Sequence, residues 1–168
     1  LPIWVEGDGE WGMDPEGLVL TRWETRDFDA LELASKGLEH RSGMDVGWVD
    51  PSAIIDSLYD RENKTIYVFN EFYKRGCQLT ELAEAIEKMN LKKNKLWVDA
   101  AEPRTISYFK SQGINAVPCL KGKDSVKMGI MFLQDHLIVV HPKCQNFITE
   151  LKNFSYLKSK QTGEYTED

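Results

Sequence analysis

Three strand-like segments follow one another at residues 44–48, 53–59 and 64–73, with only a few polar residues between them. Asp50-Pro51 is typical of a turn, and residues 60–63 form a polar tip. Strands joined by such short connections pair as antiparallel neighbours, whereas parallel neighbours need a crossover of a dozen or more residues. The pattern therefore predicts a three-stranded antiparallel meander.

The chain beyond this meander alternates between helical and strand-like patterns. Apolar residues recur at helical spacing from Leu79 to Met89, and Thr80 is expected to cap the start of that helix. These patterns predict an α/β domain with a mixed central sheet, made of the antiparallel meander plus parallel strands and flanked by helices. The further strands are expected at 95–99, 115–119 and 137–140, and the further helices at 103–112, 124–134 and 142–154.

The first 40 residues are rich in glycine, tryptophan and acidic side chains and show no sustained period. We interpret residues 1–40 as an irregular arm or linker, with one short strand around Leu18–Trp23. The sequence begins at Leu1 rather than at a methionine, so we expect it to be a piece of a longer protein. Residues 41–168 are then the folded domain, since 168 residues in all suit one domain rather than two.

Composition argues against several classes of protein. No apolar run approaches the roughly 18–20 residues that span a bilayer, so no membrane partner is expected. Three widely spaced cysteines argue against a disulfide framework or a zinc site. The net charge of −6 counts against a nucleic-acid partner. However, residues 103–160 carry nine basic and three acidic side chains, whereas residues 1–50 carry four basic and twelve acidic ones. The basic part of the chain can therefore still face a polyanion.

Two aspartates occupy positions where apolar strands would not be expected to place them. Asp45 interrupts the first strand of the meander, and Asp99 ends the apolar run 96–98. A right-handed crossover would lay the fourth strand beside the first, which brings both carboxylates within reach of one ion. Such a pair repels itself unless a cation neutralises it, and oxygen ligands favour Mg²⁺ or Mn²⁺. Gly47 would leave room for metal or substrate. The spacing alone is also compatible with an alternative in which each aspartate only caps a turn.

Blocks of sequence around both aspartates resemble motifs of one known family, the nuclease domain of tailed-bacteriophage terminase large subunits. The blocks are unrelated in composition, yet they occur in the family's order over most of the chain. They are Gly43-Met44-Asp45-Val46-Gly47-Trp48 with Asp50-Pro51 and Ala53, then Val98-Asp99-Ala100-Ala101-Glu102-Pro103-Arg104, then Lys121-Gly122-Lys123 with Ser125-Val126 and Gly129-Ile130. Upstream, the family's junction between ATPase and nuclease domains is similar to Trp11-Gly12 with Glu16-Gly17-Leu18-Val19.

The resemblance implies a ribonuclease H-like fold and a metal-dependent endodeoxyribonuclease, a hydrolase that cuts concatemeric viral DNA during genome packaging. It implies Asp45 and Asp99 as catalytic metal ligands, with two Mg²⁺ or Mn²⁺ ions in the complete site and Asp45 bridging them. The implied partners are double-stranded DNA, the ATPase domain of the same polypeptide, the terminase small subunit and the portal. The implied location is the cytoplasm of the infected bacterial host, and residues 1–40 would be an arm or linker from a missing ATPase domain.

One part of the family pattern is absent. The family's third acidic residue lies in a C-terminal helix with an Asp-Ala-Leu-Arg-Tyr-like signature, which this sequence lacks. The domain is therefore expected to lack its last helix. Glu102, three residues after Asp99, is a candidate to touch an ion directly or through water. Four basic side chains follow strand ends on the side where Asp99 emerges and are expected to contact DNA phosphates: Arg104, Lys121, Lys123 and Lys127.

Two alternative functions stay open. A Holliday-junction resolvase or integrase-like nuclease shares this fold and its carboxylates, and a non-catalytic DNA-binding or docking domain of the packaging motor would keep the fold without the chemistry. The chain has no Gly-x-x-x-x-Gly-Lys-[Ser/Thr] loop, so this piece is not itself the ATP-driven motor. Trp48 and Trp97 are expected to pack in the core, and the histidines and cysteines are expected to be structural.

Overall fold

The computed structural model describes residues 17–155, 157–158 and 165–166. Over these residues strands and helices alternate much as the sequence predicts. In chain order they are β1 (Trp23–Thr25), α1 (Ala30–Ser35), β2 (Glu39–Asp45), β3 (Ser52–Asp60), β4 (Thr65–Lys74), α2 (Leu79–Lys88), β5 (Leu96–Asp99), α3 (Pro103–Ser111), β6 (Ala116–Pro118), α4 (Ser125–Gln134), β7 (Leu137–Val140), α5 (Gln145–Asn153), β8 (Leu157–Lys158) and β9 (Tyr165–Thr166).

Seven of the described strands form one mixed sheet in the order β1-β7-β4-β3-β2-β5-β6. The antiparallel pairing of β2 with β3 and of β3 with β4 confirms the predicted meander. The remaining neighbours in this sheet pair in parallel, and the crossover through α2 places β5 beside β2 as expected. β8 and β9 form a separate antiparallel pair after α5.

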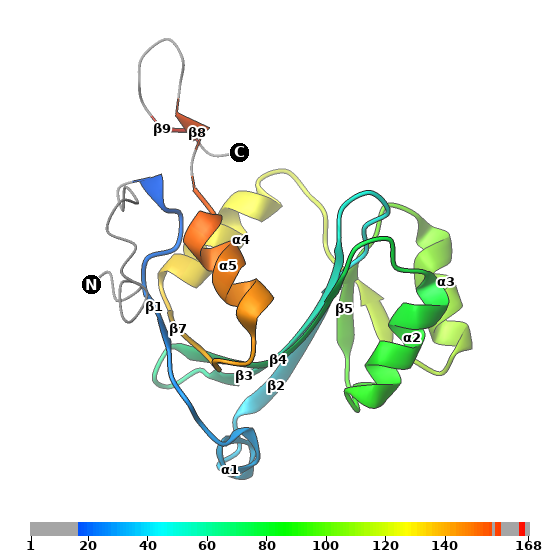
Figure 1. The fold of residues 1–168 in the computed structure, drawn as a ribbon, viewed down its shortest axis with the longest axis horizontal. Helices are drawn as coiled ribbons and strands as arrows, with labels where there is room; N and C mark the ends of the chain where they lie inside the picture. The colour runs from blue at the N-terminus through cyan, green and yellow to red at the C-terminus, as the bar shows by residue number, and fades with distance from the viewer. Residues whose placement is uncertain (1–16, 156, 159–164, 167–168) are drawn as a thin grey trace.

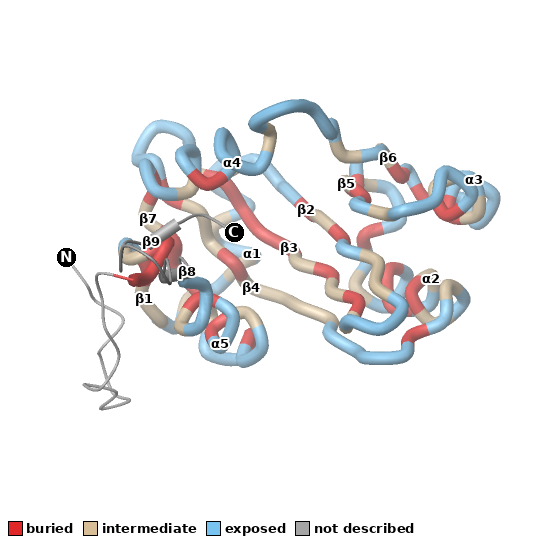
Figure 2. The backbone as a smooth tube through the Cα atoms, turned by 90° about the horizontal axis from the view of Figure 1, so that it is seen from above, coloured by how far each residue is buried: buried red, intermediate tan, exposed pale blue. Residues whose placement is uncertain are grey.

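Two apolar cores form on opposite faces of this sheet. On one face α2 and α3 pack around Leu82, Ile86 and Phe109, each of which is 0% exposed. On the other face α4 and α5 pack over β1, β7 and β4, around residues that include Val140 and Ile148. Figure 1 shows the two helical layers on either side of the curved sheet, and Figure 2 shows buried positions running through its central strands.

The first strand of the meander begins earlier than expected. It runs from Glu39 to Asp45 rather than over 44–48. Its first half is polar and lacks apolar alternation, so no local pattern marks it as a strand. The tertiary structure holds it instead, since β2 pairs along its length with β3 and the Glu39 carboxylate contacts Arg41 and Arg61 at 2.6 and 3.1 Å. Asp45 therefore ends a strand and does not interrupt one.

The start of α2 also differs from the expectation. The N-cap is Gln78 rather than Thr80, and the backbone N–H of Gln78 donates to Glu81 Oε2 at 2.7 Å. This bond satisfies an amide that would otherwise lack a partner at the helix start. The shift of two residues leaves the predicted apolar stripe in place, because Leu82, Ala85 and Ile86 are the buried residues of the helix.

Residues 17–40 have more regular structure than the sequence suggested. Trp23 is 2% exposed and begins β1, which pairs in parallel with β7 at the edge of the sheet. Asp29 starts α1 by accepting the N–H groups of Leu31 and Glu32 at 3.0 and 3.3 Å. Residues 1–16, which contain Trp11, Gly12 and Glu16 of the sequence block similar to a domain junction, lie outside the described residues. No helix in the described part of the chain is long and apolar enough to cross a membrane.

Candidate metal centre

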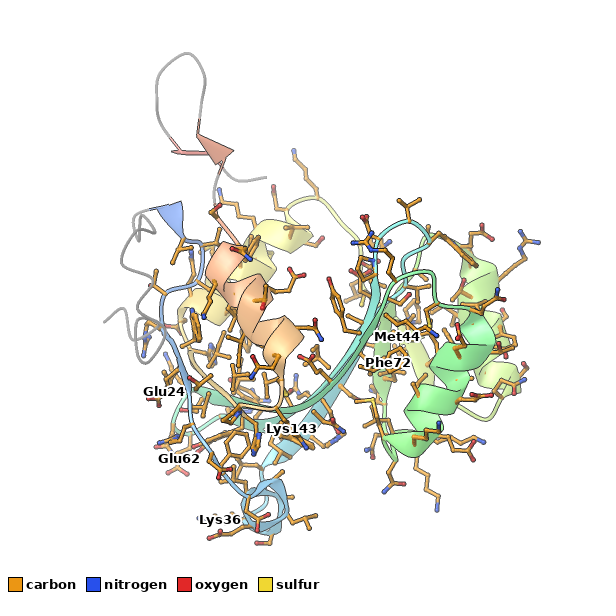
Figure 3. All side chains as sticks on the ribbon, viewed as in Figure 1. Glu24, Lys36, Met44, Glu62, Phe72 and Lys143 are labelled. Carbon is orange, nitrogen blue, oxygen red and sulfur yellow. The ribbon has the colours of Figure 1, made fainter. Side chains whose placement is uncertain are left out.

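Asp45 and Asp99 lie side by side at the ends of two parallel strands. They are register partners in the β2–β5 pair, and Val46 N–H donates to the backbone carbonyl of Asp99 at 2.9 Å. Met44 and Phe72 point toward α2 (Figure 3), and successive strand residues alternate between faces, so Asp45 points to the opposite face. The crossover and the two-residue period thus bring both carboxylates to one face of the sheet.

The turn after Asp45 brings the carboxylate of Asp50 toward the pair, close enough for its charge to act on Asp45. A Cβ on Gly47 would lie 2.4 Å from the carbonyl oxygen of Asp50, so only glycine fits this turn. Gly47 N–H also donates to Ser52 Oγ at 3.0 Å, which holds the turn closed. The small residue therefore makes room for the backbone at residues 50–51 rather than for metal or substrate.

Charge repulsion and partial desolvation act together on Asp45. Burial is the largest cause that raises the pKa of its carboxyl, followed by the negative charges of Asp99 and Asp50. Lys121 opposes this rise, and its Nζ lies 2.8 Å from Asp99 Oδ1. The hydrogen bond to Asp99 raises the pKa of Lys121 in turn, so this lysine is held in its charged form.

The donor set suits a hard divalent cation. Paired carboxylate oxygens are ligands that Mg²⁺ and Mn²⁺ prefer, and this chain already places a lysine ammonium against one of them. Within the described residues, no group of three or more His, Cys, Asp or Glu side chains could hold a metal ion. The two aspartates therefore fit an ion as a partial set of protein ligands.

Glu102 does not join this pair. It occupies the N-cap position of α3, and its Oε2 lies 3.1 Å from Nη2 of Arg104. Both side chains are exposed, so the contact is a weak surface ion pair. The structure thus places Glu102 against Arg104, one of the four predicted DNA contacts, and leaves a contact with an ion as a prediction.

The other predicted DNA contacts lie on the loop after β6 and at the start of α4. Lys121 and Lys123 are exposed on the loop, and Lys127 is exposed in the first turns of α4. Lys121 also lines a cavity of about 420 Å³ with Glu102 and Lys110 of α3. No sequence pattern marks Lys110, because it lies in the last turn of a helix and follows no strand end.

An acidic cleft of about 380 Å³ opens on the β3 and β4 side of Asp45. Asp50, Glu71 and Glu150 all line it, and α5 forms one wall. Glu71 holds that wall in place, since its carboxylate accepts the backbone N–H groups of Asn146 and Phe147 at 3.1 and 2.8 Å. No local signal marks Glu71, because the contact joins residues 75 positions apart.

Cysteine and histidine residues form no second reactive site in the described residues. The three cysteines are free, and burial raises the pKa of the Cys144 thiol to about 11, which disfavours the reactive thiolate. His136 is buried, and its Nε2 lies 2.8 Å from the hydroxyl oxygen of Tyr59. His40 contacts the buried Asp56 at 2.5 Å. These contacts agree with the structural roles expected of them.

Neither tryptophan beside the motifs belongs to a core. Trp48 is 61% exposed in the turn after Asp45, which contradicts the expectation that it packs inside. Trp97 is partly buried, but it points away from the core that contains its neighbours Leu96 and Val98. The alternation of side chains along β5 explains why Trp97 faces away from this core, since only every second residue of a strand can face one core.

A mixed sheet with a β2–β3–β4 meander, parallel strands beside it and a carboxylate pair at two strand ends defines a ribonuclease H-like domain. The family described as "Terminase RNAseH like domain" matches residues 45–168, and the chain belongs to this family. This membership favours the terminase reading over a resolvase or integrase.

The similar proteins are terminase large subunits and their nuclease domains. The PBSX phage terminase large subunit of Bacillus subtilis (strain 168) is 29% identical over 155 residues, which are 89% of this chain and 36% of that protein. The crystal structure of the g2p (large terminase) nuclease domain from bacteriophage SPP1 with bound Mn is 27% identical, with a TM-score of 0.79 over 88% of this chain and 86% of that one. The P22 large terminase nuclease domain shares the fold, with 12% identity and a TM-score of 0.63 over 93% and 82% of the two chains. The chain thus spans about a third of the curated relative.

Proposed function

We propose that this domain is the metal-dependent endonuclease of a phage terminase large subunit and cuts concatemeric viral DNA during genome packaging. The observation that carries the proposal is the register pairing of Asp45 with Asp99 on parallel strands. The Mn bound to the similar SPP1 domain supports a divalent ion at such a site. Membership of the terminase family supports DNA as the substrate.

The chain's own residues have distinct tasks in this proposal. Asp45 and Asp99 hold the ion, which when bound supplies activation of water and stabilisation of negative charge on the phosphate. Lys121 lies at Asp99 and would bind a phosphate oxygen of the substrate. Arg104, Lys123 and Lys127 bind phosphates further along the DNA, without reading its sequence.

The number of ions and their further ligands belong to the same proposal. Two Mg²⁺ or Mn²⁺ ions would occupy the complete site, and Asp45 would serve as a ligand to both. A third carboxylate from outside the described residues would complete the ligand set, and Glu102 could reach an ion only by leaving Arg104. Mn²⁺ should support DNA cleavage by this chain better than Mg²⁺ does, because Mg²⁺ demands a more nearly ideal ligand geometry.

The partners follow from the family. Double-stranded DNA is the proposed substrate, and the ATPase domain of the same polypeptide is the proposed neighbour in the chain, with the small subunit and the portal as further partners. The PBSX relative, a terminase large subunit of which this chain matches about a third (36%), supports a longer polypeptide. The proposed place of action is the cytoplasm of the infected bacterial host.

Cleavage of supercoiled plasmid tests the proposal. The chain is incubated with plasmid in EDTA, Mg²⁺ or Mn²⁺, beside the variants Asp45→Asn and Asp99→Asn. Nicking and linearisation are expected only with a divalent ion. Each substitution should reduce the cleavage rate by more than roughly 100-fold, because loss of a residue that only orients a metal ligand typically costs about 10- to 100-fold. Absence of cleavage under all conditions would leave the non-catalytic DNA-binding or docking domain as the better account.

A further inference from the structure

A strip of sheet surface beside the carboxylate pair is not covered by the described helices, which on this face pack over other strands. We define the β2–β5 strip as Arg41, Gly43, Lys95 and Trp97. Gly43 and Trp97 are register partners one step behind Asp45 and Asp99, on the same face of the sheet. The helices packed on this face, α4 and α5, lie over β1, β7 and β4 (Figure 1).

The strip combines an aromatic surface with positive charge. The Nζ of Lys95 lies 5.5 Å from the centre of the Trp97 ring. Lys95 stands four residues before Asp99, or about 13 Å along an extended chain. Aromatic rings that stack on bases, together with lysines that follow the phosphates, are the recurring means of binding a single nucleic-acid strand. The β2–β5 strip offers both within a few nucleotides of the carboxylates.

Gly43 keeps the strip open. A Cβ built at this position would lie 3.7 Å from the backbone carbonyl oxygen of Trp97, which is an ordinary contact. Alanine therefore fits without strain, whereas a larger side chain would project over the strip beside the indole. This difference allows the strip to be blocked without a change of charge.

The charges on the two sides of the carboxylate pair decide which way a polyanion can run. On the β3 and β4 side, Asp50, Glu71 and Glu150 line the cleft, and their charges would repel phosphates. On the β5 side, Lys95 and Lys121 are available, and Arg41 lies on the same strip although it also contacts Glu39. Charge therefore favours the strip over the cleft.

From this juxtaposition we propose that one strand of the DNA substrate, unpaired from its complement over this stretch, runs from Asp45 and Asp99 along the β2–β5 strip, with a base stacked on Trp97 and a phosphate bound by Lys95. The proposal rests on the proposed nuclease function and adds the path of the strand and two positioning residues. It also assigns Trp97 a role that packing does not explain.

Binding of a fluorescently labelled single-stranded DNA in EDTA, where no cleavage occurs, tests the strip separately from the chemistry. Trp97→Ala should weaken binding about 5- to 100-fold, and Trp97→Phe should restore most of it. Lys95→Gln should lower affinity and reduce the salt slope by about one, while Lys93→Gln on the preceding turn should leave the slope unchanged. Gly43→Val should weaken binding and Gly43→Ala should not. Circular dichroism of each variant checks that it folds.

The possible outcomes test the strip proposal and the nuclease proposal separately. The strip proposal would be overturned if Trp97→Ala and Lys95→Gln fold and bind DNA with wild-type affinity. It would also be overturned if the wild-type chain binds no DNA. If binding follows the strip but no ion supports cleavage of plasmid, the strip stands and the nuclease proposal fails. If the variants bind normally while Asp45→Asn abolishes cleavage, the nuclease proposal stands and the strip is wrong.

Discussion

At the scale of single residues, the position of Asp45 costs stability in the metal-free chain. Burial and the charges of Asp99 and Asp50 raise the pKa of its carboxyl, so the folded state disfavours its ionised form. An ion would relieve this repulsion, whereas in the metal-free chain only Lys121 opposes it among the charges that act on Asp45. Functional sites often hold such groups at the expense of stability.

Asp45→Asn should therefore make the metal-free chain more stable at neutral pH. Because the folded-state pKa lies above the unfolded value of about 3.9, the stability that the protonated form contributes is complete below that value and is lost as pH rises through the raised pKa. The variant should exceed the wild type above this window and match it below. Urea unfolding in EDTA at several pH values measures the difference. A variant less stable at neutral pH would contradict this account of Asp45.

Lys121 should compete with a divalent ion for Asp99. The ion pair is largely exposed, so it is weak. Lys121→Met should therefore tighten Mn²⁺ binding by about two- to fivefold, as measured by calorimetry, and should weaken DNA binding. Lys123→Met, on the same loop, is the matched control for the metal effect. Weaker Mn²⁺ binding by Lys121→Met would show that Lys121 supports the ion rather than competing with it.

At the scale of secondary-structure elements, Glu71 fixes the start of α5 against β4. Its carboxylate accepts two backbone N–H groups at the helix start, where a negative charge is also favoured by the helix dipole. Glu71→Ala should lower the free energy of unfolding by about 0.5–2 kcal/mol, the range for loss of a helix cap. Chemical denaturation measures this, with the exposed Glu87→Ala on α2 as control. Equal effects of the two substitutions would mean that the contact contributes nothing.

The elements also show what the sequence can and cannot predict. The meander and the placement of β5 beside β2 follow from short connections and right-handed crossovers, so the Asp45–Asp99 pair could be predicted. The polar half of β2 could not, because pairing with β3 rather than apolar alternation makes Glu39–Ser42 a strand. The contact of Glu71 with α5 joins distant parts of the chain and leaves no local pattern.

At the scale of the whole molecule, the overall charge of −6 conceals a separation of charges around Asp45. Carboxylates gather in the cleft on one side of Asp45, while Lys95 and Lys121 lie on the other. The uneven charge along the sequence indicated a basic half, but only the fold shows which side of the carboxylate pair each charge occupies. The Asp45–Asp99 pair thus lies between an acidic cleft on one side and two lysine side chains on the other.

Mn²⁺ binding tests most directly whether Asp45 and Asp99 hold a metal ion together. Electron paramagnetic resonance reports the free ion as the metal-free chain is titrated, beside Asp45→Asn, Asp99→Asn and Asp135→Asn, whose carboxylate instead pairs with Lys64. Saturable binding is expected in the wild type and in Asp135→Asn. Asp45→Asn and Asp99→Asn should each weaken Mn²⁺ binding by more than about 100-fold, which exceeds the effect of losing a residue that only orients a metal ligand. Equal binding by all four chains, or none by the wild type, would contradict a metal centre at these aspartates.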